Sequence, residues 1–345
     1  MMIGRSQRQM ITKVRNRIYV PMLFIGAIVL TACGSGSNGG GSTTNSGGTP
    51  AAGGTIGVSV PTVEGPYFTA MLYGITDEAQ KAGYTVTILS AGGYGKVDAQ
   101  VSQIETLTAK KVDIMLVDSG DPTATQGPIE QAVAAGLIVV GAGDPAPGAL
   151  GSVSAPHCSV GKDMAAGAKD LLPNGGDIGV LAGPAGAFWS GERLRCFKEE
   201  LAGSNINIVA EKTSDPDIAA GLAIATDMLQ RFPDLNLLYG ADDTVGNGAA
   251  AAVQAADRCG KTFVLTAVFG QQAQQQMEAG CLNYDVALQP VLIGRQAVQL
   301  GIALRNGEKP AVTEVLVPNI PVTPANMKTV DIGAMRAPEG WKPTV

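Results

Sequence analysis

The sequence predicts an α/β protein with two doubly wound parallel-sheet lobes joined by a three-segment hinge. From Thr55 onward, short apolar runs rich in β-branched residues alternate with segments of helical length. This alternation is typical of parallel sheets covered by helices on both faces. Nine such runs are too many for one compact sheet in a chain of this length, and the region is long enough for two lobes but short for three.

Nine segments are expected to form buried strands, because a strand that is covered on both faces is apolar along its whole length. They are Ile56–Val60, Thr85–Leu89, Ile114–Val117, Leu137–Val140, Ile178–Leu181, Ile206–Val209, Leu237–Tyr239, Phe263–Leu265 and Tyr284–Ala287.

Helices are expected between these strands. The helical segments are Tyr67–Ala82, Val97–Lys110, Gly127–Ala135, Ser159–Leu171, Ser190–Leu201, Asp217–Arg231, Gly246–Ala256, Gln271–Ala279 and Leu292–Arg305. In open α/β sheets, ligands bind beyond the carboxyl ends of the strands. The loops that follow the strands are therefore the place to look for a site.

The first 54 residues predict that the protein is exported from the cytoplasm. Several basic residues between positions 5 and 17 precede an apolar run at 18–30 that is too short to span a bilayer comfortably. Small residues at 31 and 32 then precede Cys33, which is typical of a bacterial lipoprotein signal. We expect cleavage after residue 32 and acylation of Cys33. An ordinary signal peptide, or a short anchor helix with a chance cysteine, is the alternative.

A tether follows at 33–54 and consists almost entirely of Gly, Ser, Thr, Asn and Pro after its cysteine. Such a composition buries too little apolar surface to offset its ordering entropy, so a flexible coil is expected. The net charge of −6 argues against a nucleic-acid partner and against a basic patch for membrane binding.

Four cysteines follow Cys33, and an even number in an exported chain is compatible with two disulfides. Cys259 and Cys281 both lie just before strands that should be adjacent in lobe two, so we pair them, which leaves Cys158 with Cys196. One histidine and no close cysteine pair give no plausible ligand set for zinc. We expect no metal.

No catalytic constellation appears in the expected loops. The chain has no phosphate-binding loop of the Gly-x-x-x-x-Gly-Lys type, no Gly-x-Ser-x-Gly elbow and no second histidine to assist a nucleophile. Gly92-Gly93 follows a predicted strand, but the third glycine and the acidic residue of a dinucleotide-binding fingerprint are missing. We therefore expect neither an enzyme nor a cofactor.

Aromatic side chains are concentrated in these loops, although aromatic residues make up 5% of the chain. Facing rings can stack on a sugar or enclose a quaternary ammonium group. The alternative is that each ring merely fills a gap beneath its own loop. The candidates are Tyr67, Phe68, Tyr94, Phe188 and Trp189.

Carboxylates are the second feature of the loops, and Asp118, Asp144 and Asp242 are the candidates to contact a ligand. Asp121 precedes a proline and is expected to cap a helix instead. Two further candidates are His157, whose imidazole could donate to a ligand oxygen, and Gln289 in the last loop. A purely structural histidine is the alternative for His157.

Seven short motifs are spaced along the region from Thr55 to about Met335. They are Thr55-Ile56-Gly57-Val58, Gly65-Pro66-Tyr67-Phe68, Lys81-Ala82-Gly83-Tyr84, Gly191-Glu192-Arg193, Phe232-Pro233-Asp234, Ala241-Asp242-Asp243 and Ile293-Gly294. In these motifs and their spacing the region resembles the type I periplasmic solute-binding proteins, the ribose-binding and LacI-like superfamily.

The residues that read the sugar in ribose-type members carry over poorly. The resemblance implies an Asp-Arg pair at a position where this chain has Asp144-Pro145. It also implies an arginine at the position where this chain has Gly191. The cleft loops of this chain contain no arginine, so anionic ligands are expected to bind worst.

A closer resemblance is to the TorT-like subgroup, typified by the periplasmic sensor protein of trimethylamine N-oxide respiration. It is carried by Ala91-Gly92-Gly93-Tyr94, Gly183-Pro184 and Thr323-Pro324-Ala325-Asn326. His157 stands where that subgroup is expected to have an aromatic residue.

The resemblance implies a monomeric solute-binding protein that closes around a small molecule and delivers it to an ABC permease. The alternative it implies is a sensor that presents a ligand such as a methylated amine to a histidine kinase ectodomain. Lobe one is expected at 55–155 plus 290–318, and lobe two at 156–289 plus 319–345. Hinge crossings are then expected near Ala155-Pro156, Gln289-Pro290 and Val317-Pro318.

Overall fold

The computed structural model describes residues 53–345. The expected signal peptide at 1–32, Cys33 and nearly all of the tether lie outside the described residues. The last tether residue, Gly54, already joins the folded part, because its carbonyl oxygen accepts a hydrogen bond from the backbone N–H of Thr85 at 3.0 Å. No helix in this described region is long and apolar enough to cross a membrane.

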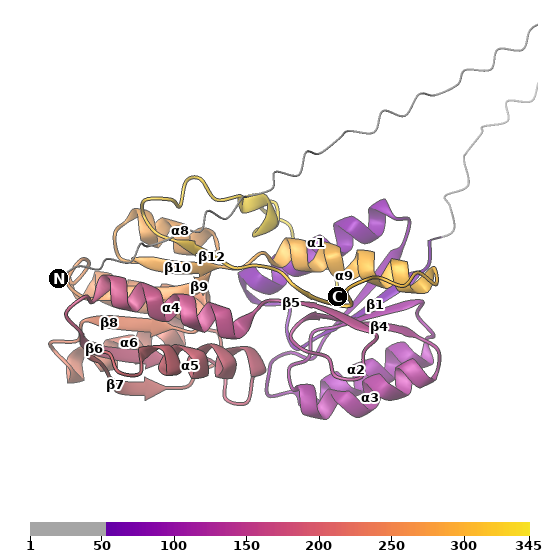
Figure 1. The fold of residues 1–345 in the computed structure, drawn as a ribbon, viewed down its shortest axis with the longest axis horizontal. Helices are drawn as coiled ribbons and strands as arrows, with labels where there is room; N and C mark the ends of the chain where they lie inside the picture. Colours follow the sequence, from indigo (N-terminus) through magenta and orange to yellow (C-terminus); the bar gives the residue numbers. More distant parts are fainter. Residues whose placement is uncertain (1–52) are drawn as a thin grey trace, which may run out of the picture. The chain divides into compact units, whose positions relative to one another are not determined.

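Lobe one contains a six-stranded sheet in the order β11-β5-β4-β3-β1-β2, and all neighbouring strands are parallel (Figure 1). Its strands are β1 (Thr55–Val60), β2 (Thr85–Ser90), β3 (Ile114–Val117), β4 (Ile138–Gly143), β5 (Gly151–Ser154) and β11 (Glu314–Leu316). Helices α1 (Gly65–Lys81) and α9 (Pro290–Arg305) pack together on one face, and α2 (Val97–Ala109) and α3 (Pro122–Ala134) on the other.

Lobe two repeats this arrangement in the order β12-β10-β9-β8-β6-β7, with β12 antiparallel to β10. Its strands are β6 (Gly176–Leu181), β7 (Ile206–Lys212), β8 (Leu237–Gly240), β9 (Phe263–Val268), β10 (Tyr284–Ala287) and β12 (Ile320–Val322). Helices α4 (His157–Leu171) and α5 (Phe188–Leu201) pack against each other, as do α6 (Ile218–Arg231) and α7 (Asp243–Ala255), while α8 (Gln271–Glu278) lies beside α7. A 3₁₀ turn, η1, spans Ile332–Ala334.

The predicted two-lobed fold is confirmed, and each of the nine predicted strands is present. Three strands were missed, β5, β11 and β12. β5 has the sequence Gly-Ser-Val-Ser, without an apolar run, and the other two are three residues long. α3 begins five residues before the predicted start, directly after Asp121, whose carboxylate accepts hydrogen bonds from the N–H groups of Thr123 and Ala124. The expected capping role of Asp121 is therefore confirmed.

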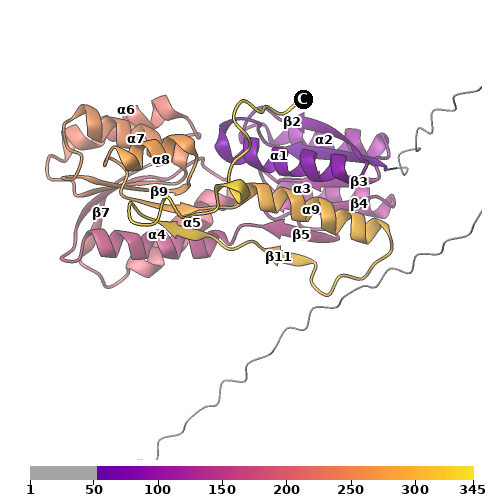
Figure 2. The same cartoon turned by 90° about the horizontal axis from the view of Figure 1, so that it is seen from above.

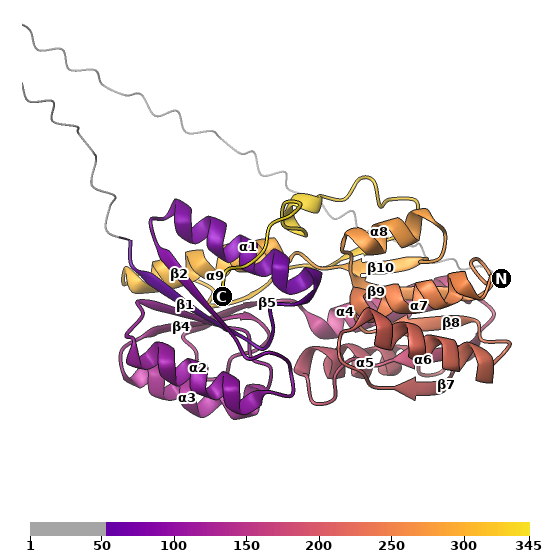
Figure 3. The same cartoon turned by 180° about the vertical axis from the view of Figure 1, so that it is seen from behind.

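The chain passes between the two sheets after β5, after β10 and between β11 and β12, at the three expected places. The C-terminal segment differs from the expectation that everything after residue 318 belongs to lobe two. Trp341 packs edge-on against Tyr73 of α1, with ring centroids 5.5 Å apart. Figures 2 and 3 show this yellow segment leaving lobe two and ending beside lobe one.

Candidate ligand-binding site

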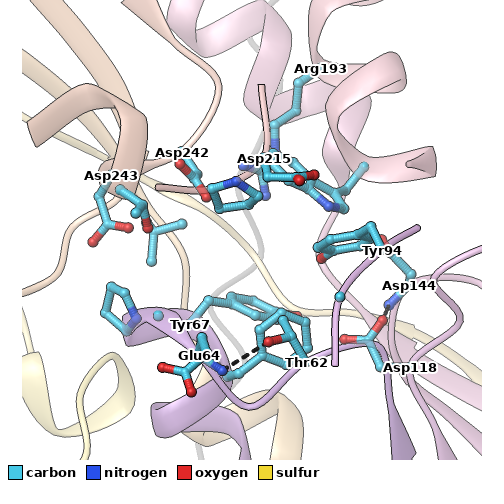
Figure 4. Close-up of a pocket in the computed structure, with 18 of the residues that line it drawn as sticks. Thr62, Glu64, Tyr67, Tyr94, Asp118, Asp144, Arg193, Asp215, Asp242 and Asp243 are labelled. Carbon is cyan, nitrogen blue, oxygen red and sulfur yellow. Dashed lines mark hydrogen bonds between the residues drawn. The ribbon is translucent and has the colours of Figure 1, made fainter. Parts of the chain in front are cut away.

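A cavity of about 250 Å³ lies where the loops after the strands of both lobes meet. Lobe one contributes the segment 62–68 after β1, the loop after β2, and single residues after β3 and β4. Lobe two contributes the first residue of α4, the first turns of α5, the segments after β7 and β8, and the last residue of β9 (Figure 4). The cavity thus has the position at the carboxyl edges that parallel sheets predict.

Eight of the nine predicted ligand contacts line this cavity: Tyr67, Phe68, Tyr94, Asp118, Asp144, His157, Trp189 and Asp242. The ninth, Gln289, does not. Its side-chain N–H donates to the carbonyl oxygen of Pro318 at 2.7 Å, so it connects two hinge crossings and lines a separate groove. The predicted ring of Phe188 is 37% exposed and is also absent from the lining.

Aromatic rings form a continuous wall across the two lobes. Tyr67 and Phe68 meet edge to face at 5.4 Å, Phe68 lies 6.4 Å from Tyr94, and Tyr94 lies 6.1 Å from Trp189. The first three rings belong to lobe one and Trp189 to lobe two. Because these spacings are those of interacting aromatic pairs, a ligand that touches the wall would contact both lobes.

Asp118 and Asp144 lie next to each other on the lobe-one side of the cavity. The N–H of Asp144 donates to Asp118 Oδ1 at 3.1 Å. Gly143, the last residue of β4, has a φ of +111°, and a β-carbon there would collide with the Asp118 carboxylate and crowd the Tyr67 hydroxyl. Burial raises the pKa of Asp118, and the neighbouring Asp144 raises it further. Burial also raises the pKa of Asp144 to about 7.

His157 is the first residue of α4 and is not part of a loop. Its side chain is buried, whereas the sequence led us to expect a half-buried imidazole. It contacts residues of both lobes. Its Nε2 lies 2.9 Å from Asp144 Oδ1, and its Nδ1 lies 3.5 Å from Arg193. Burial lowers the pKa of His157, and the adjacent Arg193 guanidinium lowers it further. The ring is therefore neutral at pH 7 and lies between the carboxyl group of Asp144 in lobe one and the guanidinium of Arg193 in lobe two.

The cavity lining includes Arg193, although the cleft loops themselves contain no arginine. It lies inside α5, not in a loop, and is 3% exposed. Its guanidinium stacks 4.7 Å from the centroid of the Trp189 ring and donates to the carbonyl oxygen of Ala241 at 2.8 Å. Trp189 and Arg193 are four residues apart and so share one face of the helix. That spacing could have revealed Arg193 once Trp189 was a candidate.

Asp242 is both a helix cap and a lining residue. Its carboxylate accepts a hydrogen bond from the N–H of Val245 at 3.0 Å at the start of α7. The next residue, Asp243, was not predicted; it accepts from the N–H of Gly270 at 2.9 Å and also lines the cavity. Burial raises the pKa of Asp242, whereas burial together with the nearby Asp242 raises the pKa of Asp243 to about 8.

Two disulfides lie in lobe two, with the pairing that the sequence predicts. Cys158–Cys196 joins α4 to α5 behind His157 and Arg193, and Cys259–Cys281 joins the segments that precede β9 and β10. Among the described residues, no cluster of His, Cys, Asp and Glu could hold a metal ion.

Two parallel-sheet lobes around an enclosed polar and aromatic cavity define a small-molecule binding protein. Residues 56–309 match the family model described as a periplasmic binding protein domain, and the chain belongs to that type I periplasmic binding protein family.

Two of its sequence relatives are named as binding proteins, and a third is named as a periplasmic protein. The chain is 30% identical over 258 residues to the ribose import binding protein RbsB of Bacillus subtilis (strain 168), covering 74% of this chain and 83% of the relative. It is 30% identical over 255 residues to the D-allose-binding periplasmic protein of Escherichia coli (strain K12), covering 70% and 82%. It is 25% identical over 296 residues to the periplasmic protein TorT of the same organism, covering 82% of each.

The fold is similar to that of a carbohydrate transporter solute-binding protein from Agrobacterium radiobacter that was solved with D-arabinose. The TM-score is 0.77 at 21% sequence identity, and the match covers 83% of this chain and 100% of that one.

Proposed function

We propose that the chain is an extracytoplasmic, lipid-anchored solute-binding protein that captures a small polar solute, such as a sugar, and delivers it to an ABC importer. The observation that carries this proposal is the cavity lined by the carboxyl-edge loops of both lobes. The names of RbsB and the D-allose-binding protein, each 30% identical to this chain, support a sugar-like solute.

The geometry supports a mechanism of capture by hinge closure. The segments in which the chain crosses between the lobes lie close together. The lobes can therefore rotate relative to each other without disturbing either sheet. Closure brings Tyr94 of lobe one and Trp189 of lobe two against the same ligand. The rings supply contact area, and the carboxyl groups of Asp118 and Asp144 accept hydrogen bonds from ligand hydroxyls.

A ligand screen by thermal shift tests solute binding directly, with neutral sugars, polyols, methylated amines and organic acids as the classes. A true ligand at 100 times its Kd adds about 2.7 kcal/mol to the free energy of unfolding. Tyr94→Ala should abolish the shift, whereas Tyr73→Ala, outside the cavity, should retain it. If Tyr94→Ala binds the ligand normally, the proposed site is wrong.

A sensor role is the second candidate, and the match to TorT over 82% of both chains favours it. In that role the liganded protein would bind the ectodomain of a histidine kinase and not a permease. Affinity purification from membranes of the source cells, with and without ligand, distinguishes the two. Recovery of a permease and its ATPase supports import, and recovery of a kinase supports sensing.

The lipid anchor rests on the sequence alone, because Cys33 lies outside the described residues. We expect Cys33→Ala to release the protein from membranes or to block its processing, since the thiol is the acyl acceptor. Membrane fractionation followed by immunoblotting measures this. A variant that fractionates like the unmodified protein would exclude acylation at Cys33.

A further inference from the structure

The cavity contains more acidic than basic side chains. Asp118, Asp144 and Asp243 are at most 3% exposed and Asp242 is half-buried, while Glu64 and Asp215 stand at the exposed rim. Figure 4 shows the two pairs on opposite sides, with Asp118 and Asp144 in lobe one and Asp242 and Asp243 in lobe two. Within the described chain, the one cationic group in the lining is Arg193, since His157 is neutral.

Arg193 does not pair with these acids. Its guanidinium donates to the carbonyl oxygen of Ala241, faces the ring of Trp189 and approaches His157. The described hydrogen bonds to Asp118, Asp242 and Asp243 come from backbone N–H groups, and Asp144 meets the neutral imidazole. Neutral donors orient a carboxylate but leave its charge uncompensated.

Buried carboxylates without a cationic partner are costly. The pKa values respond as expected, with Asp144 raised to about 7 and Asp243 to about 8, chiefly by burial. A cation inside the cavity would restore the ionised form of these groups and would gain from their combined field. An anion would disfavour that ionisation and would gain nothing from these groups.

We infer that the ligand is a small hydroxylated amine, protonated at neutral pH, of the amino-sugar or amino-polyol class. The inference deepens the proposed solute-binding function and rests on it. The wall of Tyr67, Tyr94 and Trp189 provides π-faces that attract a cation and also pack against a sugar ring. Arg193 carries N–H groups that suit hydroxyl oxygens of the ligand. A cavity of about 250 Å³ has room for one small molecule.

Calorimetric titration with matched pairs tests the charge of the ligand. The pairs are D-glucosamine with D-glucose, D-galactosamine with D-galactose, and 1-amino-1-deoxysorbitol with sorbitol, and D-glucuronate is the acidic analogue. In the pair that binds best, we expect the amine to bind at least about tenfold more tightly, which corresponds to about 1.4 kcal/mol. Tris must be avoided as a buffer, because it is itself a hydroxylated amine.

Proton release gives an independent readout. A bound cation lowers the pKa of the neighbouring carboxyl groups, so the complex should lose protons at neutral pH. The binding enthalpy of the amine should then differ between phosphate and Mops buffers in proportion to the difference in their ionisation enthalpies. The matched neutral sugar should release fewer protons.

Asp242→Asn supplies a variant that should fold, because asparagine caps helices as well as aspartate. We expect it to lose most of the preference for the amine, measured as the ratio of the binding constants of the amine and its neutral partner. Asp217→Asn is the matched control, since Asp217 caps α6 in the same way but lies outside the cavity lining. Both binding constants should be unaffected by the control.

The outcomes separate the two proposals. If a neutral sugar binds as tightly as its amine, or if D-glucuronate binds best, the inference about charge is wrong and the solute-binding function stands. If no amine, neutral compound or acid binds, both are overturned. An unchanged amine preference in Asp242→Asn would also overturn the inference.

Discussion

Single residues hold the cavity together, and Arg193 is the clearest case. One guanidinium contacts the Trp189 ring, the Ala241 carbonyl group and His157, and so fixes three segments of lobe two. Through His157 the contacts continue to Asp144 of lobe one. The side chain therefore serves the shape of the cavity as well as its charge.

Arg193→Leu should lower the free energy of unfolding by about 2 kcal/mol or more and abolish ligand binding, because the Ala241 carbonyl group loses a charged donor in a buried place. Urea denaturation followed by tryptophan fluorescence measures the first effect. Arg195→Ala is the matched control on the same helix, since its ion pairs with Glu192 and Glu199 are at the surface, and its stability should hardly change. Equal losses in the two variants would contradict the role of Arg193.

Gly143 is the second residue that the cavity requires. Alanine there suffers from both the positive φ and the collision with Asp118. We expect Gly143→Ala to lose at least about 1–3 kcal/mol of stability and to bind ligand poorly. Gly186→Ala separates the two causes, because Gly186 also has a positive φ, +83°, but has open space around its α-carbon. If Gly186→Ala is just as destabilised, backbone strain alone explains the effect.

At the scale of elements, the disulfides fix the positions of helices and loops of lobe two relative to one another. Cys158–Cys196 ties α4 to α5, the helices that carry His157 and Arg193, across 38 residues of chain. Loop-closure entropy predicts a stabilisation of about 3–4 kcal/mol for a loop of this size. The link therefore stabilises the part of lobe two that lines the cavity.

Replacing both Cys158 and Cys196 by alanine should lower the unfolding free energy by about 3–4 kcal/mol and weaken ligand binding. The same double change at Cys259 and Cys281 should lower stability but leave binding nearly intact, since these cysteines precede β9 and β10 and lie at the ends of those strands away from the cavity. Calorimetric melting and ligand titration measure the two effects. Peptide mapping without reduction checks the pairing, and crossed pairs or free thiols would contradict it.

At the scale of the whole molecule, buried carboxyl groups make stability depend on pH. Burial raises the pKa of five of them in the folded chain, Asp118, Asp144, Asp242, Asp243 and Asp285. The folded protein then binds more protons than the unfolded chain between the unfolded pKa of about 4 and the folded values. Stability therefore falls as the pH rises through this window. His157, with its lowered pKa, acts in the opposite direction below its unfolded pKa of about 6.5.

We expect the ligand-free protein to be more stable at pH 5 than at pH 8, because several carboxyl groups outweigh one histidine. Urea denaturation at constant ionic strength over this range measures the slope. A bound cationic ligand should flatten it, since the carboxyl groups are then ionised and paired. A stability that rises steadily from pH 5 to pH 8 without ligand would mean that these carboxyl groups are not buried as described.

The sequence by itself determined the two-lobed α/β fold, nine of its strands and the loops that bear the site. These features depend on local periodicity, which the sequence displays directly. Tyr67, Tyr94, Trp189 and Asp118 could be found in this way, because each lies in a loop after a strand or in the first turn of the next helix, at the carboxyl edge of a parallel sheet.

Tertiary structure alone decided the charge and connectivity of the site. Arg193 reaches the cavity from within a helix, His157 meets an acid of the other lobe, and Trp341 crosses back to lobe one. Gln289, which sequence position placed in the site, instead bonds between hinge segments. Such contacts join residues far apart in the chain, and they depend on how packed helices orient side chains and exclude water. Local sequence patterns carry no record of that packing.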